Sequence, residues 1–366
     1  YIIKYHVKLY YKYMMKNFTI YLIQLLSNLV STSCSKMCLL LGNEIEKTLN
    51  LKQGTNIYTI ISSTILAAIG KFVFIFLPYT SIIPLLFIFQ GICLLGCVTK
   101  YFIIFRTLQG FFSGWLLSIT FGLMGYISDT SRSFEIFTTT ATLLSTLVPI
   151  LNIFLGIKML FYILSIINFI SAIILFFAPI KAQCTIKKTT VQYFDFNIIL
   201  GSLLDGTILG CILTVINVTP TLVINYFYCN NYYGSIIMLL SGILSAIYSL
   251  HYINYAYLSL IITTLCLYIG YKKYILLLFI AGNITLFSIF SITNPIICKQ
   301  ITNNKEKCFN SSYFYGIRSI VTSIIMYMFT FISYIPIKII YSMVLISICL
   351  IVCNGWIYLS SYFTKK

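Results

Sequence analysis

The sequence predicts an all-α membrane protein with twelve transmembrane helices in two halves of six. Of its 366 residues, 60% are hydrophobic and only 8% are charged, and the mean hydropathy is +0.97. That is more apolar surface than a water-soluble domain can bury. Apolar segments long enough to span a bilayer recur between short polar loops. The most polar internal segment, residues 181–195, divides them into two sets of six.

The first half is predicted over residues 17–180, after a basic and tyrosine-rich N-terminal segment at residues 1–16. Each of its spans has roughly the 20 residues that a helix needs to cross the hydrocarbon core. The six predicted spans cover residues 17–41, 55–76, 80–98, 106–129, 130–156 and 159–179.

The second half is predicted over residues 196–366, after the basic linker at 181–195. The net charge is +17, from 24 Lys and Arg against 7 Asp and Glu. These basic residues concentrate at the ends and in alternate loops, so they indicate topology and lipid contacts rather than nucleic-acid binding, and the positive-inside rule places both termini in the cytoplasm. The predicted spans cover residues 197–226, 233–250, 252–271, 274–295, 313–334 and 337–363.

Small residues recur every four positions along the fourth span. Gly110, Gly114, Ser118 and Gly122 form a stripe on one helix face. Such a stripe lets the backbone of another helix approach closely, so we expect a packing seam here.

Ionisable residues mark both ends of that fourth span. Arg106 and Gln109 lie one turn apart at its start, and Asp129 and Arg132 lie at its cytoplasmic end. A guanidinium at membrane depth is costly unless it lines a cavity or finds a partner. The alternative is that Arg106 snorkels to the lipid headgroups.

Two spans contain helix-breaking residues. Pro149 and Gly156 belong to the fifth span, and Pro220 lies in the seventh. A proline inside a membrane helix bends it and frees a carbonyl that neighbouring groups must satisfy. We therefore predict bends at these positions, of the kind that transporters use at gates and binding sites.

Asp205 is the one carboxylate that the sequence places deep inside a predicted span, because Asp129 and Glu135 flank a helix end. It lies about eight residues into the seventh span, on the order of 12 Å deep at the helical rise. We expect a protonatable site or a substrate counter-charge, because intramembrane acids are functional by default. The alternative is an interfacial carboxylate at the cytoplasmic mouth. Glu44, Glu46 and Glu306 are expected in loops.

Three further cations lie within apolar segments. Lys36 and Lys71 are candidates for a central cavity, although snorkelling to the two membrane faces is the favoured interpretation for both. Arg318, on the eleventh span, is also expected to snorkel.

These patterns together resemble the major facilitator superfamily, and within it the drug:proton antiporters of the bicyclomycin-resistance (Bcr/CflA) type. The resemblance covers about two thirds of the chain, and its motifs are individually weak. They are Arg106-Thr-Leu-Gln109-Gly110 with Asp129, Pro149 followed by Gly156, and Pro220 with Tyr233-Gly234. It implies that Arg106 takes part in proton coupling and that the Pro149/Gly156 helix carries the antiporter motif.

Two departures from that family pattern affect the expected mechanism. The segment after the second span, GKFVFIFLPYTSIIP, keeps Gly70 but lacks the family's Asp and paired Arg. The acidic residue expected early in the first span is also absent, so a conformational latch and one coupling group are missing.

The sequence therefore predicts a monomeric secondary transporter in a bacterial cytoplasmic (inner) membrane, with proton-coupled efflux of small amphipathic or cationic compounds. The open alternatives are a nutrient or osmolyte symporter or uniporter, and a degenerate chain without transport. Its expected partners are a small-molecule substrate, protons and lipids. We expect no enzyme activity or cofactor, because the sequence has no nucleotide-binding loop and no His-rich or carboxylate-paired site. We expect no metal, because the 12 cysteines form no CxxC pair and no Cys/His cluster.

Overall fold

The structure is a computed structural model that describes residues 20–23, 25–39, 41–77, 80–124, 147, 151–152, 154–177, 195–229, 240, 253–301 and 307–363. These residues form helices, and no strand occurs among them. The helices are Ile20–Leu39, α2 (Gly42–Thr48), α3 (Thr55–Phe76), α4 (Ile83–Gly96), α5 (Phe102–Met124), α7 (Ile157–Phe177), α8 (Phe196–Asn225), α10 (Ile253–Lys272), α11 (Leu276–Ile301), α12 (Lys307–Thr330) and α13 (Ile335–Phe363), with a short 3-10 turn at Thr80–Ile82.

The predicted membrane character is confirmed in this part of the chain. Seven helices are long and apolar enough to cross a bilayer, and an eighth span results if Ile20–Leu39 and α2, which meet at 81°, count as one. The predicted fifth and eighth spans lie almost wholly outside the described residues. The count of twelve therefore stays a prediction.

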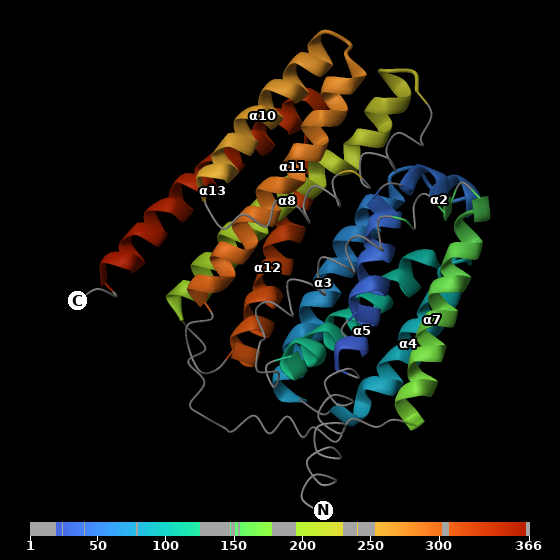
Figure 1. Ribbon diagram of the computed structural model, residues 1–366. Helices are drawn as coiled ribbons and strands as arrows, with labels where there is room; N and C mark the ends of the chain where they lie inside the picture. The colour runs from blue at the N-terminus through green and yellow to red at the C-terminus, as the bar shows by residue number, and fades with distance from the viewer. Residues whose placement is uncertain are drawn as a thin grey trace, which may run out of the picture.

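The helices form two groups (Figure 1). In the first, α3 packs on α5, and α4 packs on α5 and α7. In the second, α8 packs on α11, α12 and α13, and α10 packs on α11. The groups meet where α12 lies against α3 and α5. The predicted division into two halves, with boundaries at 180 and 196, remains a proposal.

Close approaches at glycines set the direction of neighbouring helices. Gly110 of α5 lies against the backbone of Ser63 of α3, and Gly114 lies against that of Ala67. Residue numbers therefore increase in the same direction along the two helices. In the second group, Gly206 and Gly210 of α8 face Val321 and Ile325 of α12 in the same way. The α3–α5 pair and the α8–α12 pair are therefore parallel. They are spans two and four and spans seven and eleven, which must run in the same direction if successive spans cross the membrane in alternating directions.

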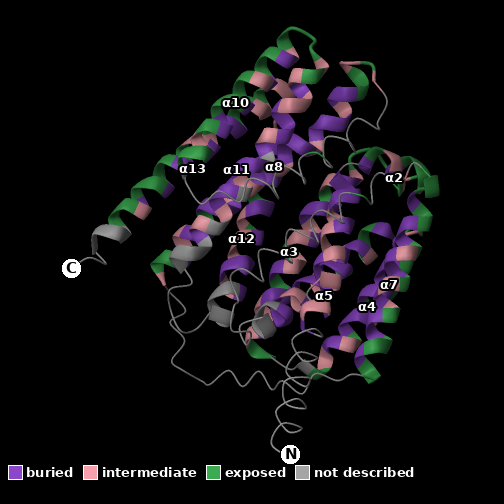
Figure 2. Cartoon of the chain, viewed as in Figure 1, coloured by how far each residue is buried: buried purple, intermediate pink, exposed green. Residues whose placement is uncertain are grey.

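Burial separates the central helices from those on the outside. Figure 2 shows mostly buried residues on α8 and an exposed face along α13. In the most apolar part of α8, 67% of residues are buried, compared with 28% in α13. The exposed residues of α13 are largely Ile, Val, Leu and Tyr, as expected for a surface in contact with lipid.

The segment predicted as the first loop contains a helix instead. Glu46, on α2, is buried and accepts hydrogen bonds from the backbone N–H groups of Gly54 at 3.1 Å and Asn56 at 2.7 Å. The carboxylate therefore satisfies free donors at the start of α3 and complements its dipole. The prediction of an ordinary loop position for Glu46 was wrong, because a carboxylate ten residues before a helix can fold back onto it only in three dimensions.

The α3–α5 seam makes a prediction about stability. A Cβ at position 114 would collide with the Ala67 backbone, which cannot move as a flexible side chain can. We expect Gly114→Ala to destabilise the protein by about 1–3 kcal/mol, seen as a lower thermal midpoint in neutral detergent. Gly355→Ala is the control, because nothing lies within 4 Å of a Cβ there. Equal midpoints for the two variants would contradict the seam.

Candidate functional site

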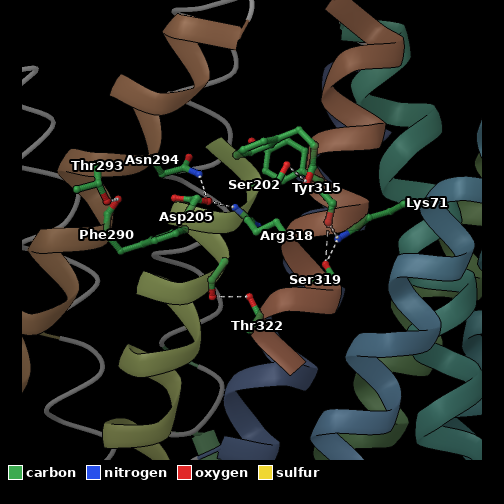
Figure 3. A network of polar contacts seen from close by, with 12 residues as sticks. Lys71, Ser202, Asp205, Phe290, Thr293, Asn294, Tyr315, Arg318, Ser319 and Thr322 are labelled. Carbon is green, nitrogen blue, oxygen red and sulfur yellow. Dashed lines mark hydrogen bonds and ion pairs between the residues drawn. The ribbon is translucent and has the colours of Figure 1, made fainter. Parts of the chain in front are cut away.

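A buried ion pair joins α8 and α12. Asp205 has no exposed surface, and its Oδ2 lies 3.1 Å from Nη1 of Arg318. The same oxygen accepts a hydrogen bond from Nδ2 of Asn294 on α11 at 2.9 Å. It is the one ion pair among the described residues. Asp205 is therefore an embedded carboxylate held by three helices, and Figure 3 shows it between Asn294 and Arg318.

The pair is incompletely satisfied. Oδ1 of Asp205 and Nε of Arg318 are buried and have no hydrogen-bond partner. The guanidinium carbon lies 4.5 Å from the ring centroid of Tyr315 and 5.7 Å from that of Phe290, within the range of cation–π attraction. Arg318 thus has one carboxylate and two aromatic faces as partners, and the carboxylate keeps one oxygen for a further donor.

Polar contacts between α8 and α12 hold the pair in register. The hydroxyl of Thr322 donates to the carbonyl of Gly206 at 3.1 Å, and the hydroxyl of Ser202 lies 3.2 Å from the carbonyl of Phe314. These bonds lie on either side of Asp205 and need a close approach of the two backbones, which Gly206 allows. The small residues that precede and follow Asp205 therefore fix how far it lies from Arg318.

The prediction that Arg318 snorkels was wrong. The side chain turns toward α8, because a carboxylate inside the helix bundle is a better partner for it than distant headgroups are. Arg318, Asn294 and Ser319 are site residues that sequence reasoning missed. The available signal was the low hydropathy of α12, whose polar residues Ser312, Ser319, Thr322 and Ser323 are all buried.

Lys71 connects the two groups of helices. Its Nζ, at the C-terminal end of α3, donates to the hydroxyl of Ser319 at 2.7 Å and to the carbonyl of Tyr315 at 3.3 Å, both on α12. The residue is buried, so the favoured prediction that it snorkels to the membrane face was wrong. Figure 3 shows it approaching α12 from the side opposite Asp205. Two cations, Lys71 and Arg318, and one carboxylate, Asp205, therefore meet around one segment of α12.

The same end of α3 carries a second contact between the groups. Phe72 packs edge-on against Tyr313 with ring centroids 5.9 Å apart, and its ring covers Gly316. Contacts of residues 71–72 with residues 313–319 thus tie α3 to α12 directly after Gly70, where the family's latch residues are absent.

Arg106 lies in a separate cluster within the first group. It is buried, and its guanidinium donates to Oε1 of Gln109, to Sγ of Cys38 at 3.4 Å and to the hydroxyl of Ser35 at 3.4 Å. Gln109 is fully buried. None of these contacts involves Asp205, so the structure does not bring the two predicted coupling residues together.

The remaining predicted residues are dispersed. Lys36 is buried near the end of helix Ile20–Leu39, and Pro220 is buried inside α8. Gly156 has φ +74°, a left-handed conformation that favours glycine, and directly precedes α7. Gly122 belongs to the last turns of α5. Three predicted residues lie outside the described part of the chain: Asp129, Arg132 and Pro149.

Two solved structures match nearly the whole chain. One is a bacterial homologue of the iron transporter ferroportin in an outward-facing state, with a TM-score of 0.64 and 11% identity over 93% of this chain and 99% of that one. The other is a D-xylose-proton symporter, with a TM-score of 0.66 and 12% identity over 91% of this chain and 96% of that one. The chain has the major facilitator fold.

Sequence comparison adds no narrower assignment. No protein-family model and no curated protein matches this chain. At 11% and 12% identity, the two structures establish the major facilitator fold and leave the activity to be argued from the site. The resemblance to the Bcr/CflA subfamily stays a prediction.

The ion pair makes a prediction about stability. Arg318→Met leaves Asp205 as an unpaired buried charge, and we expect a loss of about 3–5 kcal/mol. The double variant Asp205→Asn/Arg318→Met should recover part of this loss, because no charge is left unpaired. Thermal unfolding of purified protein in neutral detergent provides the measurement. Additive losses in the double variant would contradict a direct pair.

The contact of Lys71 makes a second prediction. Ser319→Ala removes the shorter of its two hydrogen bonds, and we expect a loss of about 1 kcal/mol, as is usual for bonds between membrane helices. Thr330→Ala is the matched control, because its hydroxyl is exposed and bonds only within α12. A loss for Ser319→Ala no greater than for Thr330→Ala would show that the bond contributes nothing to stability.

Proposed function

We propose that this chain is a secondary transporter that moves a small molecule by alternating access, with the Asp205–Arg318 pair as its proton-coupling element. The observation that carries the proposal is that Arg318, the partner of Asp205, lies on the same segment of α12 that Lys71 of α3 binds. A change in the charge of Asp205 therefore alters the electrostatic energy of the contact between the two helix groups.

The sign of the coupling follows from the three charges. With Asp205 ionised, its negative charge holds Arg318 and offsets the repulsion between Arg318 and Lys71. Protonation removes that charge and leaves two neighbouring cations, Lys71 of α3 and Arg318 of α12, whose repulsion is strong in a site with little water. Proton binding at Asp205 therefore favours separation of α3 from α12, and proton release favours their contact.

The location of this contact fits a gate. Its residues are at the C-terminal end of α3 and in the first half of α12. Under the predicted topology, with both termini in the cytoplasm, this end faces the cytoplasm. The state described here would then be closed on the cytoplasmic side, and protonation would promote opening there. Pro149, Gly156 and Pro220 are proposed as further points of bending.

The direction and cargo follow from the resemblance alone. It predicts efflux of amphipathic or cationic compounds driven by protons, in a bacterial inner membrane, with the chain acting as a monomer and not as an enzyme. Nutrient or osmolyte symport would use the same coupling element. The contacts of Lys71 with α12 weaken the third alternative, a degenerate chain, because they connect the helix groups where the family latch is missing.

A flux assay tests the proposal. The intact chain in liposomes with an acidic interior should take up ethidium, a fluorescent cation, in a gradient-dependent manner. Asp205→Asn should reduce the initial rate by roughly tenfold or more, because it removes the charge that changes on protonation. Asp195→Asn should leave the rate unchanged within about a factor of two, since Asp195 lies at a helix end and asparagine caps helices equally well.

The outcomes separate the alternatives. Uptake that survives Asp205→Asn would keep the carrier and reject the coupling site. An intact chain that moves no ethidium, but moves protons when amino acids, sugars or carboxylic acids are added, would favour symport over efflux. An intact chain that responds to none of these compounds would contradict transport itself.

A further inference from the structure

Arg106 differs from Arg318 in having no counter-charge. No carboxylate lies within ion-pair distance of its guanidinium in the part of the chain that the structure describes. Glu46, the buried carboxylate described in the first helix group, is instead bonded to the start of α3. A buried cation without an anion is costly, so a missing partner is the feature that needs an explanation.

The acceptors around Arg106 are few and uncharged. A guanidinium carries five N–H groups, and the described acceptors are the Gln109 amide oxygen, the Cys38 sulfur and the Ser35 hydroxyl. The Ser35 contact, at 3.4 Å, is long for an N–H···O bond, and the Cys38 sulfur is a weak acceptor. Gln109 adds a donor, because its Nε2 is fully buried and has no partner. The cluster offers positive charge and spare donors with few acceptors.

Ser35 is half-buried and continues a row of half-buried hydroxyl residues, Ser31 and Thr32, along helix Ile20–Leu39. Polar side chains of that helix therefore adjoin the cluster.

We propose that Arg106 and Gln109 bind an oxyanion, the carboxylate or phosphate group of a small acid that the transporter carries. The planar fork of a guanidinium matches the two oxygens of such a group, the Nε2 of Gln109 adds a third donor, and the ligand supplies the missing negative charge. This inference depends on the proposed function only in taking the acid to be the cargo. On this inference the cargo is acidic, and the flux assay should respond to carboxylic acids instead of the ethidium that the resemblance predicts.

Binding is tested without any flux. Calorimetry on the intact chain in neutral detergent compares benzoate, benzamide and benzylammonium, which share one ring and carry charges of −1, 0 and +1. We expect benzoate to bind at least roughly tenfold more tightly than the other two, and Arg106→Gln to remove that preference. Lys158→Gln is the charge-matched control, because Lys158 is exposed on α7 of the same helix group.

A second variant distinguishes ligand binding from a purely structural role. Gln109→Glu changes the side chain little in size, keeps the oxygen that Arg106 already binds and adds the missing negative charge. It should abolish benzoate binding and raise the thermal midpoint, as a bound anion would. Benzoate binding that survives in Gln109→Glu or Arg106→Gln, or an intact chain that binds all three probes equally or none, would overturn the proposal.

The source of the oxyanion is decided in nanodiscs. Benzoate affinity that is equal in phosphatidylcholine alone and with phosphatidylglycerol indicates a soluble acid, whereas suppression by phosphatidylglycerol indicates a lipid phosphate at the same site. Benzoate binding without any flux would contradict the transporter proposal alone. Flux without binding that depends on Arg106 would contradict this inference alone.

Discussion

The structure depends on how a few charges are held inside an apolar helix bundle. Asp205 and Arg318 lie where water is scarce, so each needs the other, and the helices that carry them must stay in one register. Gly206 and Gly210 let α8 and α12 approach closely enough for this pairing, and Thr322 bonds the two backbones beside it. The close packing of α8 on α12 therefore also determines where the charges of the ion pair lie.

The same arrangement couples the two helix groups. Arg318 stacks on Tyr315, whose carbonyl accepts a bond from Lys71 of the other group. Lys71 of α3, Asp205 of α8 and Arg318 of α12 thus meet at one turn of α12. Under the proposed function, the balance among these three charges changes when a proton binds to Asp205. An element with two charge states at an interface is what a conformational switch requires. Lys71 directly follows Gly70, in the segment where the resemblance leads us to expect an Asp and paired Arg that the sequence lacks.

Arg106, which is buried, and Arg318, which is half-buried, show opposite solutions to one physical problem. Arg318 has an internal carboxylate, so its charge is offset within the protein. Arg106 has an amide oxygen, a thiol and a hydroxyl, which are weaker partners for a cation. A cation in this condition would gain from an external anion, and this contrast is the reason for proposing that the cluster binds an oxyanion.

Composition and hydropathy by themselves determined that this is a helical membrane protein, because the length and apolarity of a span depend only on local sequence. The spacing of Gly110 and Gly114 indicated a packing face, and the depth of Asp205 indicated an embedded acid. Neither could name a partner. Whether Arg318 and Lys71 snorkel or pair depends on which helices lie beside α12, and residues 71, 205 and 318 come together only when distant segments pack. The tertiary structure decided this, since the energy of a buried charge is set by its neighbours in space and not by its neighbours along the chain.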